Sequence, residues 1–252
     1  MNNSGNQVRL GKPRVEKARV SGIYGPLVIG VFLTFLGLAW RHYPGYTWIY
    51  NDISYLGSPE LNPQGWGYWA IGMAITGLLC IPIIFSLVGQ MKEVGTTMKG
   101  WVRIGFILYL ACAYGMIGLG LVPQFPGAVF LGFHIFHAVL AMGGLYLGTF
   151  CWGVVIFRHL LDNTATITPI SKGGFLLTVV FGYGGPVGFL ITQGVRLAQG
   201  GEYRDCATEP CPWYLAFSAW EWILFLCIFA TFVVFWYLVP HLTAQKASKV
   251  PS

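Results

Sequence analysis

The chain has 252 residues, 55% of them hydrophobic and only 10% charged, with a formal net charge of +6 at pH 7. Soluble domains carry about 25% charged residues, so this composition excludes an ordinary soluble protein. Six bilayer-spanning helices of about 20 residues each would use nearly the whole chain, which leaves no room for a separate soluble domain.

Positive charge is concentrated in front of the first apolar stretch, within residues 1–21. The basic residues nearest to that stretch are Arg9, Lys12, Arg14, Lys17 and Arg19. A juxtamembrane cluster of this kind favours cytoplasmic retention and contact with anionic lipid, so we expect no nucleic-acid partner. The apolar stretch is long and no A-x-A-like site follows it, which predicts an uncleaved first helix instead of a signal peptide.

Six apolar stretches long enough to cross a bilayer follow in chain order. They cover residues 22–40, 66–88, 101–122, 130–157, 173–197 and 214–239. The predicted fold is therefore an all-α polytopic membrane protein. One six-helix domain is expected over residues 22–240, followed by a tail over residues 241–252.

Lysine and arginine occur mainly in alternate loops between these stretches. Lys92 and Lys99 lie between the second and third, Arg158 and Lys172 lie between the fourth and fifth, and residues 123–130 carry no charge. Because basic loops remain in the cytoplasm, we expect both termini on the cytoplasmic side of the plasma membrane.

Two of the six cysteines, Cys206 and Cys211, lie in a polar loop before the sixth stretch. The predicted orientation places this loop in an oxidising compartment, where the two can form a disulfide. A pair of free thiols and half of a metal site are the alternatives. The other four cysteines lie within the apolar stretches, where Cys packs as a small apolar side chain.

Glycine and proline residues occur within the predicted helices. Small residues at a spacing of four, as in residues 144–148 and 184–188, allow close helix packing. Pro82 and Pro186 are expected to kink the second and fifth helices. Packing is the main interpretation of these glycines, and a cavity beside the Gly-rich residues 182–186 is the alternative.

Several polar residues are predicted to collect in the outer half of the membrane. Asp52 and Ser54 belong to an aromatic-rich loop, residues 42–60, that follows the first stretch. His134 and His137 are three residues apart and therefore share a helix face near the start of the fourth stretch. Because polar groups at membrane depth are costly, each of them needs a structural or functional reason.

Glu221 lies beside Trp220, about two turns inside the sixth stretch. At 1.5 Å per residue this is about 10 Å from the outer end. A carboxylate at that depth is protonated, paired or turned toward a wet cavity. By topology Glu221 belongs to the same half of the membrane as Asp52 and His134, so we expect some of these side chains to meet.

This outer cluster has three interpretations. It comprises Asp52, Ser54, His134, His137 and Glu221, with Trp220 as an apolar wall. It either pins the outer loop to the bundle or binds a lipid or small amphiphile, with the carboxylates as negative charge and the histidines as donors. Histidines and carboxylates also suit zinc, so a membrane-embedded hydrolase, with Ser54 or a metal-bound water as nucleophile, is the third.

The outer loop also resembles a known family. Its residues 43–46 and 51–59, ending in Ile53-Ser54-Tyr55-Leu56-Gly57, are similar to the first outer loop of a prokaryotic six-helix membrane family catalogued as domain of unknown function 998. A Phe-Pro element and a histidine at the start of the fourth helix, also typical of that family, correspond to Phe125-Pro126 and to His134 or His137. An acidic residue common in the family is replaced by Tyr55, and Asp52 is acidic instead.

A more distant similarity is to the eukaryotic DRAM and Sfk family, on Ser58-Pro59-Glu60 and the six spans. That resemblance implies a role in lipid organisation, lipid-anchor remodelling or autophagy regulation. Neither family implies a settled reaction, and the chain has no HExxH, nucleotide or haem motif. We therefore expect no cofactor, favour a non-enzymatic protein with membrane lipids as partners, and retain a homo-oligomer or an accessory subunit of a membrane complex as alternatives.

Overall fold

The structure is a computed structural model that describes residues 12–49, 51–122, 128–162, 168–198 and 217–247, and all regular elements in these ranges are helical. The helices are α1 (Lys12–Arg41), a 3-10 turn η1 (Ile53–Gly57), α2 (Trp66–Val94), α3 (Lys99–Leu121), α4 (Ala128–Asp162), α5 (Pro169–Val179), a π-helical turn η3 (Val180–Gly184), α6 (Gly185–Ala198) and α7 (Phe217–Ala247). The all-α prediction is confirmed.

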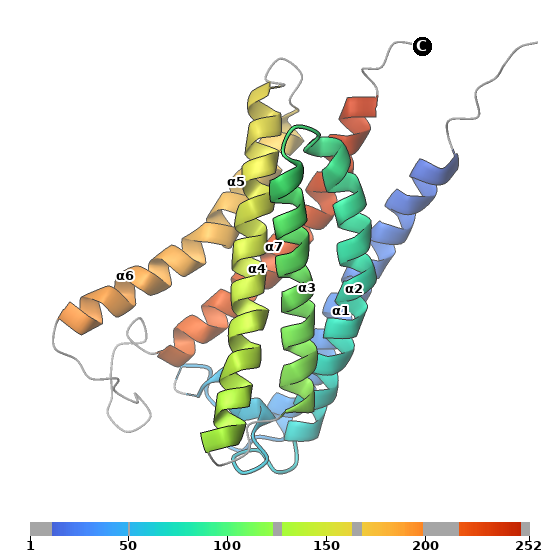
Figure 1. Cartoon of the computed structure of the whole chain (residues 1–252). Helices are drawn as coiled ribbons and strands as arrows, with labels where there is room; N and C mark the ends of the chain where they lie inside the picture. Colours follow the sequence, from blue (N-terminus) through green and yellow to red (C-terminus); the bar gives the residue numbers. More distant parts are fainter. Residues whose placement is uncertain (1–11, 50, 123–127, 163–167, 199–216, 248–252) are drawn as a thin grey trace, which may run out of the picture.

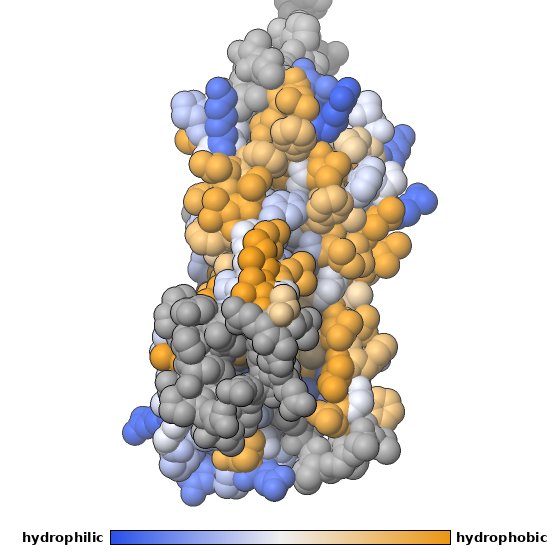
Figure 2. Space-filling model, turned by 90° about the vertical axis from the view of Figure 1, so that its left-hand side faces the viewer, coloured by the Kyte–Doolittle hydropathy of each residue, from blue (hydrophilic) through white to orange (hydrophobic). Residues whose placement is uncertain are grey.

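Six helical stretches are long and apolar enough to cross a membrane, as predicted. They are Tyr24–Arg41, Trp66–Val94, Lys99–Leu121, Leu131–Asp162, Pro169–Val195 and Phe217–Thr243. Figure 2 shows hydrophobic side chains over the middle of one face and hydrophilic side chains at its two ends. Length, composition and this banding indicate an integral membrane protein.

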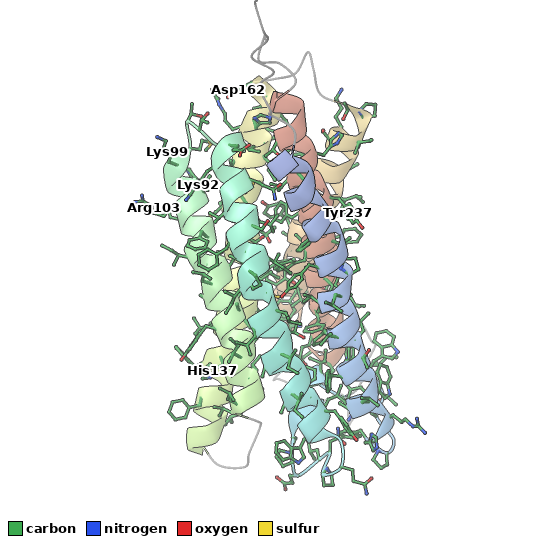
Figure 3. All side chains as sticks on the ribbon, turned by 90° about the vertical axis from the view of Figure 1, so that its right-hand side faces the viewer. Lys92, Lys99, Arg103, His137, Asp162 and Tyr237 are labelled. Carbon is green, nitrogen blue, oxygen red and sulfur yellow. The ribbon has the colours of Figure 1, made fainter. Side chains whose placement is uncertain are left out.

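The two ends of the bundle differ in charge. α1 begins and α7 ends at the same end of the molecule (Figure 1). Figure 3 places Lys92, Lys99 and Arg103 at that end, which we call the basic end, and His137 toward the opposite end, which we call the η1 end. This separation is the one that the alternate loops predicted, and the cytoplasmic location of the basic end stays a prediction.

Glycines bring α2, α3 and α4 into close contact. A methyl group added at Gly115 of α3 would collide with the Ala141 backbone nitrogen in α4, and one at Gly144 would lie 2.5 Å from the Leu108 carbonyl oxygen. A methyl at Gly120 would collide with the Ala70 carbonyl oxygen in α2. Backbones this close tolerate no side chain, so these glycines set the spacing of the three helices.

The fifth span is broken where proline was expected to act. The π-helical turn η3 ends directly before the Gly185-Pro186 start of α6. Pro186 has no N–H to donate, and its ring would collide with the carbonyl four residues earlier, at Gly182, so the preceding turn widens. Figure 1 shows the consequence, since α6 swings away from α4 and remains beside α7. α2, by contrast, continues through Pro82 to Val94.

Candidate functional site

The η1 loop, residues 42–49 and 51–65, is folded onto the end of the bundle. Its Tyr46 is 7% exposed, and the hydroxyl donates to the carbonyls of Asn51 and Asp52 at 3.1 Å each. The same oxygen accepts a hydrogen bond from the Trp222 indole nitrogen in α7 at 2.9 Å. An aromatic side chain with a satisfied hydroxyl therefore joins the loop to the sixth span.

Two carboxylates make a second connection between this loop and α7. Glu221 Oε2 accepts a hydrogen bond from the Ile53 backbone nitrogen at 2.8 Å. Ser218 Oγ donates to Asp52 Oδ1 at 2.5 Å. The sequence predicted that some of the outer polar residues meet, and Ser54 and Glu221 do so, since η1 places the Ser54 backbone N–H against the Glu221 carboxylate. These bonds give the cluster a structural role in holding the loop.

The protonation of Tyr46 follows from its surroundings. Burial raises the pKa of its hydroxyl well above the ordinary 10.0, and the nearby charges of Glu221 and Asp52 add to that effect, while the bond from Trp222 opposes it. The hydroxyl is therefore protonated at physiological pH and remains a hydrogen-bond donor.

A cavity of about 380 Å³ lies beneath the η1 loop. Residues of α1, α2, α3, α4, α7 and η1 line it, and most of them are apolar. Ser54, His134 and Glu221 line it at the η1 end. The cavity therefore combines a long apolar wall with a small polar group at one end, as sites for small amphiphiles do.

Unpaired polar atoms are concentrated around this cavity. Six buried side-chain nitrogen or oxygen atoms among the described residues have no hydrogen-bond partner, and four of them belong to lining residues. The four are Trp69 Nε1, Thr76 Oγ1, His134 Nδ1 and Trp236 Nε1. Buried polar groups are normally satisfied, so this concentration is typical of a site that holds water or a ligand.

The two predicted histidines have different surroundings. His134 is 6% exposed and lines the cavity. His137 packs on α3, where a methyl group at Gly118 would collide with its ring. Its Nδ1 lies 2.8 Å from the Phe133 carbonyl oxygen, an acceptor, so Nδ1 donates along its own helix. Only His134 shares the cavity with Glu221.

Trp220, the other predicted ligand residue, faces α6. A methyl group at Gly188 would lie 2.8 Å from its ring, and the Phe189 ring lies 6.4 Å away. The aromatic wall of the cavity comes instead from Phe225, Phe229 and other residues of α7. A stripe of aromatic residues at helical spacing after Glu221 was the sequence signal for this wall, but it is equally typical of ordinary core.

The geometry around Ser54 and the histidines bears on the hydrolase interpretation. Among the described residues no three His, Cys, Asp or Glu side chains group as metal ligands would. In the same ranges no histidine hydrogen bonds to Ser54 or Ser218, and Ser218 donates to a carboxylate instead. Cys206 and Cys211 lie outside the described residues, so their disulfide stays a prediction, and the other four cysteines are free thiols.

Comparisons with family models, curated proteins and solved structures give no match to this chain. The two family resemblances therefore stay predictions, and the cavity is the feature from which a function is argued.

Proposed function

We propose that the protein binds an amphiphile taken from the membrane, inside the helical bundle, with the polar part of the amphiphile at the η1 end. The observation that carries this proposal is the apolar cavity of about 380 Å³ that ends at Glu221, His134 and Ser54. Pockets for small molecules measure about 300–1,000 Å³ and combine apolar walls with a few polar groups.

The energetic cost of an empty cavity supports an occupant. Enclosed cavities cost about 24 cal/mol per Å³, so this volume would cost at most on the order of 9 kcal/mol if no molecule filled it. Net stabilities of proteins are about 5–15 kcal/mol. An apolar chain that fills the space would remove most of that penalty.

The shape of the cavity suits an extended chain. Its lining residues on α7 run from Glu221 to Tyr237, and at 1.5 Å per residue that separation is about 24 Å. The hydrocarbon core of a bilayer is about 30 Å thick. A long alkyl or isoprenoid chain matches this length better than a compact molecule does.

Filling the cavity tests the proposal. The substitution Ala138→Phe places a ring among the lining residues of α4, whereas Val139→Phe places the same ring at a position that is 63% exposed on the apolar surface. Native mass spectrometry and lipid extraction, applied to protein purified in mild detergent, should find a bound amphiphile in the wild type and in V139F. In A138F the bound amphiphile should be lost.

Two results would contradict the proposal. One is a wild-type protein that carries no amphiphile and takes none up from added lipid. The other is an A138F variant that remains folded and retains as much amphiphile as V139F does.

A further inference from the structure

Charge at the polar end of the cavity restricts the ligand. Glu221 lines the cavity, and Asp52 lies close enough to interact with it electrostatically. None of the described lining residues is Lys or Arg. Proteins bind phosphate and carboxylate groups through Arg, Lys or free backbone N–H groups, so an anionic group here would meet the Glu221 carboxyl and no cationic side chain among the described lining residues.

Hydrogen-bonding capacity at the same end favours a donor. The Glu221 carboxylate accepts from the backbone N–H groups of Ile53 and Ser54, and a carboxylate has about four acceptor positions, so two remain for a ligand. His134 Nδ1, in a side chain that is 6% exposed, has no partner. A hydroxyl or amino group can donate to Glu221 and also pair with the imidazole.

Among the described lining residues, the exposed ones lie on α1 and α7 and none lies on the η1 loop. Ile53, which lines the cavity from the η1 loop, is 2% exposed. The exposed lining residues are Pro26, Gly30 and Tyr237, and they mark the opening of the cavity. No atom lies within 4 Å of the position that a Gly30 side chain would occupy.

This opening lies toward the basic end of the molecule. Figure 3 places Tyr237, which is 61% exposed, nearer to Lys92 and Asp162 than to the η1 end. At Gly25 a methyl group would lie 2.9 Å from the Trp236 ring, so α1 and α7 touch there and border the opening. A chain that starts at Glu221 and follows the cavity can therefore leave between α1 and α7 into the bilayer.

From these four features we propose the class of ligand: a long-chain amphiphile with a hydrogen-bond-donating alcohol or amine group and without phosphate or carboxylate. Its polar group binds Glu221 and His134, and its chain extends through the opening between α1 and α7. The proposal rests on the proposed function, since it specifies what that site holds and how the ligand reaches it.

A series of single-chain probes of equal length tests the polar group. A long-chain alcohol, a long-chain amine, an alkyl phosphate and lysophosphatidate are titrated into the detergent-solubilised full chain, with binding followed by native mass spectrometry. The alcohol and the amine should bind at least about tenfold more tightly than either phosphate, equivalent to about 1.4 kcal/mol. Glu221→Gln keeps an acceptor for Ile53 but removes the group that could take the negative charge beside a bound ammonium, so it should weaken the amine more than the alcohol.

The outcomes separate this inference from the proposed function. Phosphates that bind as tightly as the alcohol, with binding abolished in A138F, would overturn the ligand class and leave the proposed function intact. Failure of every probe to bind would overturn both. An unchanged ratio of amine to alcohol binding in E221Q would overturn the role of Glu221.

Closing the side opening tests the route. Gly30 and Gly37 lie on the same face of α1, and both are exposed with no atom within 4 Å of the place that an added Cβ would take, but only Gly30 lines the cavity. Gly30→Trp should slow exchange of a fluorescent long-chain alcohol between vesicles and reconstituted protein by about tenfold, equivalent to about 1.4 kcal/mol of barrier. Gly37→Trp should leave the exchange unchanged. Equal exchange rates in the two variants would contradict a route between α1 and α7.

Discussion

Membrane helices pack in two different ways in this molecule. One way joins α2, α3 and α4 to one another, and the other joins α1 to α7. In the first group, glycines such as Gly115 and Gly144 bring the backbone atoms of neighbouring helices into direct contact. Between α1 and α7, rings separate the backbones: the Phe32 centroid lies 5.0 Å from that of Phe225 and 4.8 Å from that of Phe229.

The difference explains where the cavity forms. Small residues allow helices to approach until their backbones touch, whereas large rings hold helices apart and leave space wherever the rings end. Towards the η1 end the rings of Phe32, Trp40 and Trp222 fill that space. Towards the basic end, Gly30 contributes no side chain and the space remains open.

Gly115→Val should be the most damaging change. Its Cβ would collide with the Ala141 nitrogen and lie 2.6 Å from the His137 carbonyl oxygen, and backbone atoms cannot move aside as a flexible side chain can. Overpacking costs about 1–3 kcal/mol and occasionally more, and we expect the upper end. Thermal unfolding in detergent measures the loss. Gly143→Val in α4, where no atom lies within 4 Å of the added Cβ, is the control, and equal losses in the two variants would contradict close packing of α3 on α4.

Glu221→Ala should loosen the connection between the η1 loop and α7. It leaves the Ile53 N–H without its acceptor, and a buried donor without a partner costs about 1–3 kcal/mol. Hydrogen exchange at residues 51–57 should accelerate, while exchange in α3 should not. The exposed Glu60 in the same loop gives the control Glu60→Ala; the prediction fails if both variants have the same exchange rates.

Tyr46→Phe should have a smaller, pH-dependent effect. It removes the bonds to Asn51 and Asp52 and leaves the Trp222 N–H unpaired, at a cost of about 1–2 kcal/mol. Because the pKa of Tyr46 is raised in the folded protein, its contribution is complete below about pH 10 and is lost as the pH rises above that value. The wild type should therefore lose more stability than Y46F between about pH 9 and pH 11. Parallel losses in both proteins would show that Tyr46 does not carry this dependence.

Gly30→Ala should have the smallest effect on the stability of the folded protein, and it should raise that stability. With no atom within 4 Å of the added methyl, the variant gains only the helix preference of Ala over Gly, about 0.5–1 kcal/mol. Gly25→Ala is the matched comparison on the same helix, because its methyl meets the Trp236 ring at 2.9 Å. Stabilisation of both variants, or of neither, would contradict the difference in packing between these two positions.

Those features of the fold that are set by local sequence were predictable before the structure was known. The number of spans follows from apolar length, and the separation of charge follows from Lys and Arg in alternate loops. The break near Pro186 follows from the missing N–H of proline. Its form as the π-helical turn η3 was not predictable, because a kinked helix and a widened turn both accommodate a residue without an N–H. Close packing at Gly144 was likewise predictable from spacing.

The site was predictable only in part, because it depends on which faces of the helices meet. Topology alone placed Asp52 and Glu221 in the same half of the membrane. In the structure Asp52 of the η1 loop bonds to α7, and Glu221 of α7 bonds to the η1 loop. Helical spacing put His134 and His137 on one face, but three residues are about 300° of a 3.6-residue turn, and that offset turns His137 to α3. Thr76 and Trp236 look like core residues in the sequence, and only the cavity distinguishes them.

The bond between Ile53 and Glu221 joins residues that are 168 positions apart in the chain. At a synthesis rate of about 5–20 residues per second, roughly 8–34 s pass between the translation of the first and that of the second. During that interval four further helices must enter the membrane, and the loop after the first span has no anchor on α7. Closure of the η1 end is therefore a late event of biogenesis, and a chain that terminates before its last helix lacks Glu221 and leaves the η1 loop without its anchor on α7.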